Sequence, residues 1–443
     1  MEAIVLSIGD ELVLGQTVDA NSAWLSARLA EQGIATRYHQ TLADELEPIT
    51  AAIQSASQQA PLVLITGGLG PTEDDLTRQA LAEALASPLV RDADSLAQIE
   101  AFFAARGKPM PERNKVQANR PQAAAAVLND AGTAPGIHAT LNQAVIYAMP
   151  GVPREMRRMY DNTIKPALDE ANRQNPRDVL RTRKLNTFGQ GESDVAELLK
   201  AHMARDANPT VGTTVTNGIV SVRLRARCPT NEQADAALDR LTEQIEQALG
   251  PIVFGRDEQT LQQSVIGLLK DNALRLATAE SCTGGLIGAM LTDVAGSSDA
   301  YLGGWVTYTN AMKQNELGVA GSVLAEHGAV SEPVVRSLAE GALHKSGADL
   351  AVSVSGVAGP GGGTDQKPVG TVWIGLAGRA SPTSDTNGQP GLETEAMQFR
   401  LPGDRPAVRD RAAKCALQMI RLRLLGEPIT HLRWGNPAAT SSA

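Results

Sequence analysis

Short, fully apolar strands alternate with amphipathic helical segments at both ends of this 443-residue chain. Apolar strands separated by helices are typical of a parallel sheet that is covered on both faces. In the first stretch the pattern predicts strands at Ala3–Ile8, Ala35–Gln40, Leu62–Thr66 and Ala144–Ala148, and helices at Ala20–Glu31 and 46–57. The sequence therefore predicts an α/β domain over residues 1–170.

The same alternation returns in the last third of the chain. The predicted elements there are strands at Leu274–Thr278, Gly304–Thr309, Leu350–Ser355 and Val369–Leu376, and a final helix at 404–425. They indicate a second α/β domain over residues 256–426. Between the two domains, residues 171–255 are predicted to form a small α+β module. We expect residues 380–395 to be a mobile surface loop and residues 427–443 to be a flexible tail.

Composition excludes several classes of protein. The net charge of −9 disfavours direct nucleic-acid binding, because phosphate contacts need a basic surface. In the middle module, Arg223, Arg225 and Arg227 alternate along one strand, and we interpret them as a solvated face. The three cysteines are too few and too scattered for a disulfide framework. The sequence shows neither an apolar run of about 20 residues nor a signal peptide at its start, so we expect a cytoplasmic protein without membrane contact.

A glycine-rich loop follows the most apolar strand of the first domain. Its sequence over residues 67–75 is Gly-Gly-Leu-Gly-Pro-Thr-Glu-Asp-Asp. Ligands bind at the carboxyl ends of strands in such sheets, and glycine amides can approach phosphate oxygens closely. The next helix is expected to begin near Asp74, and Asp74 with Asp75 suggests a Mg²⁺-like ion beside a phosphate. The alternative is that both acids only cap that helix.

Further polar loops follow other strands of the same predicted sheet. Asp19 and Asn21 open the first helix, and Pro150-Gly151-Val152-Pro153 leads to Glu155 in the first turn of a later helix. If these strands are parallel neighbours, the loops converge on one edge of the sheet.

In the second domain, Ser281 lies in a strand-to-helix turn and is followed by Thr283, Gly284 and Gly285. A serine nucleophile needs a base, and Lys313 lies just beyond the next strand, near Tyr308. A lysine acts as a base only when neutral, so burial must lower its pKa well below its usual value. The alternatives are a serine that caps a helix, a lysine on the surface, and Cys282 as the nucleophile.

These motifs carry a resemblance to a known family. The N-terminal half resembles the molybdopterin-binding-like three-layer domain of the competence/damage-inducible (CinA) family, through Thr66–Thr77, Asn114, residues 132–136 and residues 150–156. Residues 274–425 resemble the C-terminal CinA deamidase domain, with the runs 277–285, 296–298, 306–310, 328–332, 355–363, 368–373 and 403–405. The middle module resembles the family's small KH-like connector. Thr309 stands where serine is commoner in the family.

The resemblance implies two hydrolytic activities on breakdown products of NAD. The C-terminal domain would deamidate nicotinamide mononucleotide without a cofactor, with Ser281 as nucleophile, Lys313 as base and Tyr308 assisting. Its other expected ligand contacts are Thr283, Gly284, Gly285, Ser298, Ser355, Gly356, Gly359 and Arg405.

The N-terminal domain would hydrolyse ADP-ribose with a divalent ion (Mg, Mn or Co). We expect Asp75 to hold that ion, with Asp74 or Glu155 assisting. The expected nucleotide contacts are Asp19, Asn21, Gly67, Gly68, Gly70, Thr72, Asn114, Pro150 and Gly151. The resemblance also implies a homodimer. The alternative is a competence- or recombination-associated interaction protein in which one domain or neither is catalytically active.

Overall fold

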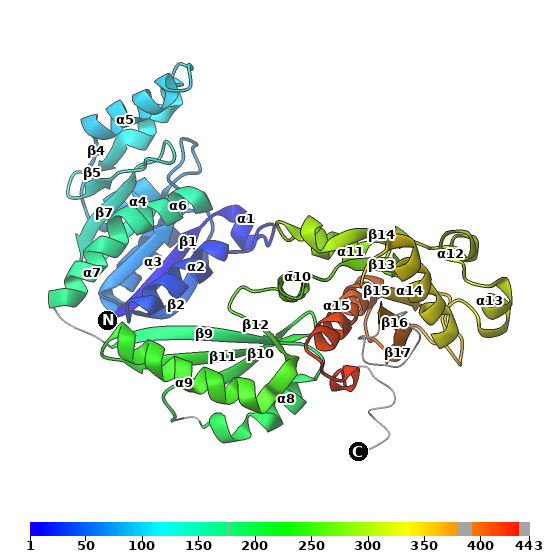
Figure 1. Cartoon of the computed structure of the whole chain (residues 1–443). Coiled ribbons are helices and arrows are strands. Elements are labelled where there is room, and N and C mark those ends of the chain that lie inside the picture. The colour runs from blue at the N-terminus through cyan, green and yellow to red at the C-terminus, as the bar shows by residue number, and fades with distance from the viewer. Residues whose placement is uncertain (175–177, 205, 380–391, 434–443) are drawn as a thin grey trace. The chain divides into compact units, whose positions relative to one another are not determined.

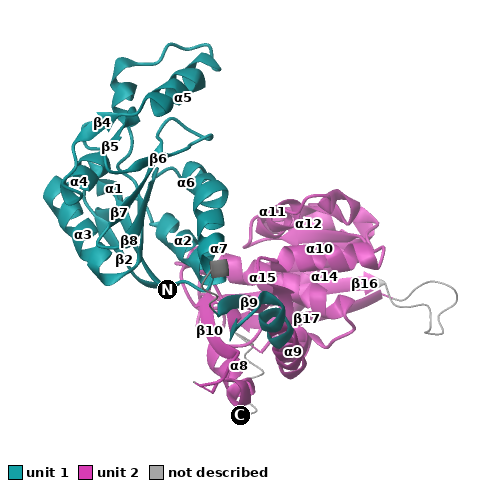
Figure 2. Cartoon of the chain, turned by 90° about the vertical axis from the view of Figure 1, so that its left-hand side faces the viewer, with its two compact units in different colours: residues 1–182, 226–237 teal, residues 183–225, 238–443 magenta. Residues whose placement is uncertain are grey.

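The computed structural model describes residues 1–174, 178–204, 206–379 and 392–433. The chain divides into two compact units (Figure 2). The first contains residues 1–182 and 226–237, and the second contains residues 183–225 and 238–443. Each unit is described by itself.

A sheet that includes β1, β2 and β7 forms the centre of the first unit (Figure 1). It has six strands in the order β2–β1–β3–β8–β7–β6. Its strands are β1 (Glu2–Ile8), β2 (Ala35–Leu42), β3 (Leu62–Thr66), β6 (Ala125–Val127), β7 (Gly136–Leu141) and β8 (Ala144–Met149). Strands β2, β1, β3 and β8 are parallel, whereas β7 and β6 are antiparallel to their neighbours. The parallel sheet expected from the sequence therefore forms the centre, and an antiparallel edge is added to it.

Helices cover both faces of this sheet. Alternate residues of β1 point into two different cores, because Ile4 and Leu6 belong to one and Ala3 and Val5 to the other. The helices of this unit are α1 (Asp10–Val13), α2 (Ala20–Glu31), α3 (Leu46–Gln59), α4 (Thr77–Ala84), α5 (Ala93–Ala104), α6 (Pro153–Met159) and α7 (Lys165–Gln174). Helices α3 and α4 pack in the first core, and α2 and α6 pack in the second. This gives the expected three layers.

A four-stranded sheet, ordered β10–β11–β9–β12, follows along the chain. Its strands are β9 (Val179–Thr187), β10 (Thr210–Thr216), β11 (Ile219–Cys228) and β12 (Val253–Arg256), with helices α8 (Glu192–Leu198) and α9 (Asn231–Leu249). Strand β11 alternates strictly: Val220, Val222 and Leu224 are buried, and the residues between them form the other face of the sheet.

The C-terminal sheet has the order β14–β13–β15–β16–β17. Its strands are β13 (Leu276–Glu280), β14 (Tyr301–Val306), β15 (Leu350–Gly356), β16 (Thr371–Arg379) and β17 (Leu392–Arg400). The first three are parallel and the last two antiparallel. One core contains α10 (Leu261–Asp271), α11 (Leu286–Thr292) and α15 (Arg405–Leu424); the other contains α12 (Asn310–Leu317), α13 (Gly321–His327) and α14 (Glu332–Ser346).

Three expectations differ from the structure. The helix after the glycine-rich loop begins at Thr77, not near Asp74, because the Asp75 side chain bonds the loop's own amides. Of the loop expected at 380–395, residues 392–395 belong to strand β17, and 380–391 lie outside the described residues. Of the expected tail at 427–443, Leu432 is fully buried, and 434–443 are likewise not described.

Within the described residues, no helix is both long and apolar enough to cross a membrane.

Candidate functional site

Ser281 directly follows β13, the strand that lies between β14 and β15. Its backbone amide donates to the carbonyl of Val354 at 3.0 Å, which fixes the turn to the neighbouring strand β15. The residues after it form a tight turn in which Gly284 and Gly285 have φ values of +62° and +92°. Glycine, which has no Cβ, takes this left-handed backbone at little cost, so the two glycines let the chain reverse into α11.

The structure brings Lys313 to this serine. The Lys313 Nζ donates to Ser281 Oγ at 3.1 Å and to the Thr307 carbonyl oxygen at 2.8 Å. The side chain lies in α12, whose first turn is capped by the Thr309 hydroxyl, and it is only 1% exposed. Burial lowers the pKa of Lys313, since water no longer solvates its ammonium. Within the described residues no carboxylate forms an ion pair with it. The pair thus has the geometry of a nucleophile and its base.

Cys282 is a poor competitor for the nucleophile's role. Its side chain is 6% exposed and packs in the core beneath α11 and α15. Burial raises the pKa of the Cys282 thiol to about 12, so very little reactive thiolate exists near neutral pH.

Glu280, the last residue of β13, was not expected from the sequence to have a role. Its buried carboxylate accepts hydrogen bonds from the backbone amides of Gly285 (3.0 Å), Ile287 (3.1 Å) and Gly288 (2.9 Å). These amides start α11, so the positive end of that helix is already neutralised by a carboxylate. Within the described residues, the amides of Cys282 and Thr283 in the turn itself donate to no backbone carbonyl. They are therefore the donors available to a developing oxyanion.

Arg405 connects two loops beside the serine–lysine pair. Its guanidinium donates to the Gly359 carbonyl at 2.9 Å and to the Tyr308 hydroxyl at 3.0 Å. Tyr308 is itself exposed, and its backbone carbonyl lies 3.4 Å from Lys313 Nζ. The structure therefore places Arg405, Tyr308 and Gly359 together at the mouth of this site.

Strand β15 brings the Ser355 loop to the same edge of the sheet. Ser355 is buried and its hydroxyl donates to the Ala329 carbonyl at 2.7 Å, so it holds the loop after α13. Gly356 has no room for a side chain, because an added Cβ would lie 2.7 Å from Val372.

Arg409 is a second residue that sequence reasoning missed. It lies one turn after Arg405 on α15 and donates to the Thr283 carbonyl at 2.8 Å. No local pattern could identify it, because it and its partner are 126 residues apart.

Ser298 is not brought to the pair within one chain. It precedes β14, and β14 runs parallel to β13. It therefore lies at the start of the strands, whereas Ser281 follows their carboxyl ends. The expected contact of Ser298 with the same ligand is not supported by this topology.

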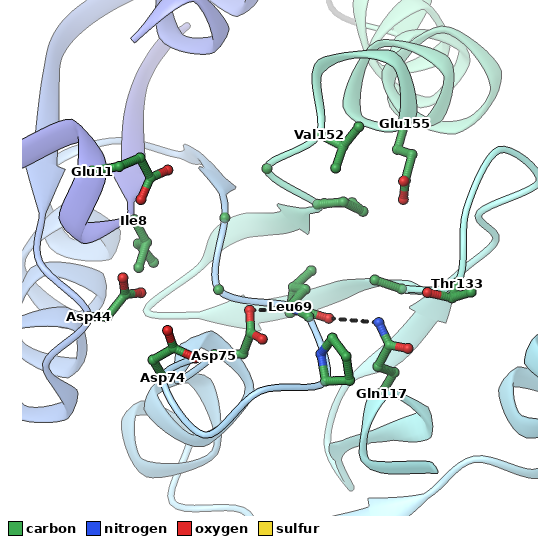
Figure 3. Close-up of a pocket in the computed structure, with 18 residues that line it drawn as sticks. Ile8, Glu11, Asp44, Leu69, Asp74, Asp75, Gln117, Thr133, Val152 and Glu155 are labelled. Carbon is green, nitrogen blue, oxygen red and sulfur yellow. Dashed lines mark hydrogen bonds between the residues drawn. The ribbon is translucent and has the colours of Figure 1, made fainter. Parts of the chain in front are cut away.

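A pocket of about 540 Å³ opens at the carboxyl edge of the first sheet (Figure 3). Its lining residues come from six segments of the chain: Ile8, Gly9, Glu11, Asp44, Gly67, Gly68, Leu69, Gly70, Pro71, Asp74, Asp75, Gln117, Thr133, Ala134, Pro150, Gly151, Val152 and Glu155. The expected convergence of the glycine-rich loop with the Pro150–Glu155 segment is thus present.

Asp75 holds the glycine-rich loop in shape. Its carboxylate accepts from the amides of Gly70 (2.6 Å) and Thr72 (2.8 Å), and also from the Thr72 hydroxyl. A carboxylate has about four acceptor positions, so one position is left for a ligand. Asp74 is fully exposed beside it, and a hydrogen bond from Thr72 holds the pKa of Asp74 below its usual value.

Several other expected contact residues lie outside the pocket lining and hold its loops in place. Asn21 donates to the Gly151 carbonyl at 2.8 Å and to Thr66, whose hydroxyl donates to the Pro150 carbonyl. Asp19 caps α2 by accepting from Ser22, and Asn114 donates to Gln117, which lines the pocket. These contacts position the loops but do not themselves line the pocket.

The pocket lining is acidic and includes no lysine or arginine within the described residues. Glu11, Asp44, Asp74 and Asp75 lie on one side of it, and Glu155 lies across from them (Figure 3). Burial raises the pKa of Asp44, and the charges of Asp10, Asp74 and Glu11 raise it further. No three of the described His, Cys, Asp or Glu residues form a metal-binding cluster. Mg²⁺ needs only one or two protein carboxylates when substrate phosphates and water complete its shell, so the residues present fit such an ion.

Comparison with known proteins agrees with this three-part architecture. Residues 4–170 match the family described as "Probable molybdopterin binding domain", residues 182–255 match the "Damage-inducible protein CinA KH domain", and residues 258–424 match the "CinA C-terminal domain". The chain is 38% identical to a CinA-like protein of Geobacter sulfurreducens, over 96% of this chain and 100% of that protein. It is 40% identical to a CinA-like protein of a Synechococcus species, over 96% and 98%.

The chain belongs to the CinA family. Solved structures of shorter relatives also match it. The competence/damage inducible protein CihA from Agrobacterium tumefaciens is 37% identical, covering 37% of this chain and 93% of that chain with a TM-score of 0.33. The competence damage-inducible protein A from Klebsiella pneumoniae is 35% identical, covering 38% and 98%, with a TM-score of 0.33. The domain boundaries near residues 170 and 256 stay a prediction.

Proposed function

We propose that the C-terminal domain hydrolyses the carboxamide of nicotinamide mononucleotide to nicotinate mononucleotide and ammonia. The observation that carries this proposal is the 3.1 Å contact between Lys313 Nζ and Ser281 Oγ, made by a lysine that is almost completely buried. The substrate itself comes from the family resemblance of the surrounding loops.

The reaction begins when Ser281 Oγ attacks the carboxamide carbon and Lys313 Nζ takes the hydroxyl proton. The amides of Cys282 and Thr283 stabilise the negative charge on the carbonyl oxygen. The carbon–nitrogen bond then breaks, Lys313 gives the proton to the leaving nitrogen, and ammonia departs from an acyl-serine ester. Water attacks the ester, Lys313 takes a proton from it, and that proton returns to Ser281 as the carboxylate product forms. Arg405 can pair with the phosphate of the substrate.

Ammonia release from nicotinamide mononucleotide tests this proposal. Ser281→Ala is expected to lower the rate at least about 1,000-fold, because the covalent route needs the hydroxyl. Cys282→Ala is the matched control and is expected to keep most of the activity. Full activity in Ser281→Ala, or loss only in Cys282→Ala, would contradict the assignment.

We infer a second activity, divalent-ion-dependent hydrolysis of ADP-ribose, in the pocket of the first unit. The support is electrostatic: the lining has five carboxylates and no basic side chain, so a diphosphate would be repelled unless a cation lay between them. Asp75, with Asp74 or Glu155, would hold the ion. The ion would supply charge neutralisation and an activated water. The amides of Gly67, Gly68 and Gly70 are suited to the phosphate oxygens.

Two such domains in one chain would act together in the salvage of pyridine nucleotides. We further propose that the protein works as a homodimer in the cytoplasm. Co-purification with a recombination protein, combined with no turnover of either substrate, would instead favour the interaction-protein alternative.

A further inference from the structure

A second pocket lies inside the second unit, away from the serine–lysine pair. Its volume is about 430 Å³, within the range of small-molecule sites. It is lined by Lys184, Asn186, Thr214, Thr216, Asn217, Ile219, Ser221, Arg223, Phe254, Asp257, Glu258, Gln259, Thr260, Leu261, Gln262, Met290 and Lys414. We call it the sheet-face pocket, because its floor is the face of β9, β10 and β11 opposite Val220 and Val222.

Hydroxyl and amide groups form the floor of the sheet-face pocket. On β11, Ser221 and Arg223 point to this face, and across from them on β10 stand Thr214 and Gly212. Gly212 has open space where a side chain would be, since a Cβ built there meets no atom within 4 Å. The guanidinium of Arg223 therefore has room beside it for a ligand.

Arg223 is the cation of this pocket that lacks a carboxylate partner within the described residues. Lys184 is paired with Glu258 at 3.0 Å, and Lys414 with Asp410 at 2.7 Å. Arg223 instead donates its Nε to the Thr214 hydroxyl at 3.3 Å, which leaves its two terminal nitrogens for another acceptor. A planar guanidinium of this kind pairs with a phosphate through two parallel hydrogen bonds.

Part of the pocket lining is apolar. Phe254 and Leu261 are nearly fully buried in the core, and Ile219 and Met290 pack against that core and are partly exposed. The exposed parts of Ile219 and Met290 can accept the flat face of a ring.

The pocket is also held in a fixed shape. The buried Asn186 side chain donates to the carbonyls of Asp257 and Gln259 and accepts from the Ser221 hydroxyl. Lys414 donates to the Asn217 carbonyl at 3.1 Å, which ties α15 to the β10–β11 turn. Because these groups are already ordered, a ligand would lose little free energy in arranging them.

We propose that the sheet-face pocket binds a small phosphorylated ring compound, of the size of a nucleoside monophosphate, with its phosphate on Arg223 and its ring against Ile219 and Met290. This site does not rest on the proposed amide hydrolysis, and either can hold without the other.

Adenosine monophosphate is the probe for this site, titrated by calorimetry into the full chain. Arg223→Ala is expected to weaken the binding at least about tenfold, the loss of a charge-assisted hydrogen bond. Arg225→Ala is the matched control, because Arg225 is exposed on the same strand face but does not line the pocket. It is expected to bind as the unmodified chain does.

Hydrogen exchange locates the bound nucleotide. Adenosine monophosphate is expected to slow amide exchange in residues 210–223 and 257–262, and adenosine without phosphate is expected to bind at least about tenfold more weakly. Inorganic phosphate alone tests whether the ring contributes, and it is expected to bind more weakly than the nucleotide. The proposal would be overturned if Arg223→Ala and Arg225→Ala weakened binding equally, or if amide exchange slowed only outside residues 210–223 and 257–262. It would also be overturned if adenosine or inorganic phosphate bound as tightly as adenosine monophosphate.

Discussion

The guanidinium of Arg405 donates to the hydroxyl of Tyr308 at 3.0 Å, although the two residues are 97 positions apart. This contact joins the start of α15 to the loop whose backbone carbonyls surround Lys313. The last helix of the chain therefore helps to form the mouth of the site that β13 and α12 begin.

Lys313→Met tests the base directly. The change removes the amine but keeps an apolar chain of similar length in a buried position, so we expect amide hydrolysis to fall by about 100- to 10,000-fold. The free energy of unfolding should stay equal or rise, because a buried cation without an ion-pair partner is lost. Ammonia release and urea denaturation measure the two effects. Lys345→Met, at a lysine whose side chain is 49% exposed, is the control; an active Lys313→Met variant would contradict the assigned base.

The pH dependence follows from the lowered pKa of Lys313. The neutral amine is the active form, so kcat/KM is expected to rise about tenfold per pH unit below that pKa and then to level off. The folding stability is also expected to rise with pH. Between the lowered folded pKa and the ordinary 10.5, the unfolded chain holds a proton that the folded chain has released, so folding stability rises with pH relative to Lys313→Met. A kcat/KM that falls as pH rises through this range would argue against a neutral lysine.

Cys282 should be unreactive toward alkylating agents. With a thiol pKa of about 12, only about 1 in 10,000 molecules carries a thiolate there at pH 8. We expect iodoacetamide to leave amide hydrolysis unchanged while mass spectrometry shows Cys282 unmodified in the folded chain. The partly exposed Cys228 serves as the internal reference. Rapid labelling of Cys282 with parallel loss of activity would revive the thiol as the nucleophile.

Glu280→Gln should destabilise the second unit. One oxygen of the carboxylate becomes a donor that faces backbone amides, so at least one charge-assisted hydrogen bond is lost and a buried N–H is left without an acceptor. We expect the free energy of unfolding to fall by about 2 kcal/mol or more. Chemical denaturation measures it, with Glu326→Gln, at a side chain that is 74% exposed, as the control. An equally stable Glu280→Gln variant would show that the three bonds contribute little.

Asp75→Ala should abolish ADP-ribose hydrolysis. The change removes both the expected oxygen ligand and the acceptor that holds Gly70 and Thr72. Removal of divalent ions with a chelator should have the same effect on the unmodified chain, and added Mg²⁺, Mn²⁺ or Co²⁺ should restore it. Phosphate-product analysis measures both. Turnover that persists without a divalent ion would contradict the metal-dependent assignment.

The pairing of Ser281 with Lys313 could be predicted because both follow strands that are parallel neighbours. Contacts from the last helix to the serine turn could not be predicted in this way. Arg409 reaches the serine turn from a helix more than 120 residues later, and nothing in its local sequence distinguishes it from other arginines of α15. The start of α4 at Thr77 differs from the predicted one because the Asp75 carboxylate accepts from an amide of its own loop, and residue spacing does not reveal which partner a side chain takes. Ser298 could have been placed from the sequence, because it precedes the predicted strand Gly304–Thr309 and so lies at the end of the parallel strands opposite to Ser281.

The burial of Lys313 has a consequence for how this chain can change. A buried amine surrounded by carbonyls and a hydroxyl gives the fold a lower free energy of unfolding than a methionine or leucine at this position would. Mutation and selection for heat tolerance alone would tend to replace Lys313. The resulting protein would have a higher free energy of unfolding and no amide hydrolysis activity in its C-terminal half.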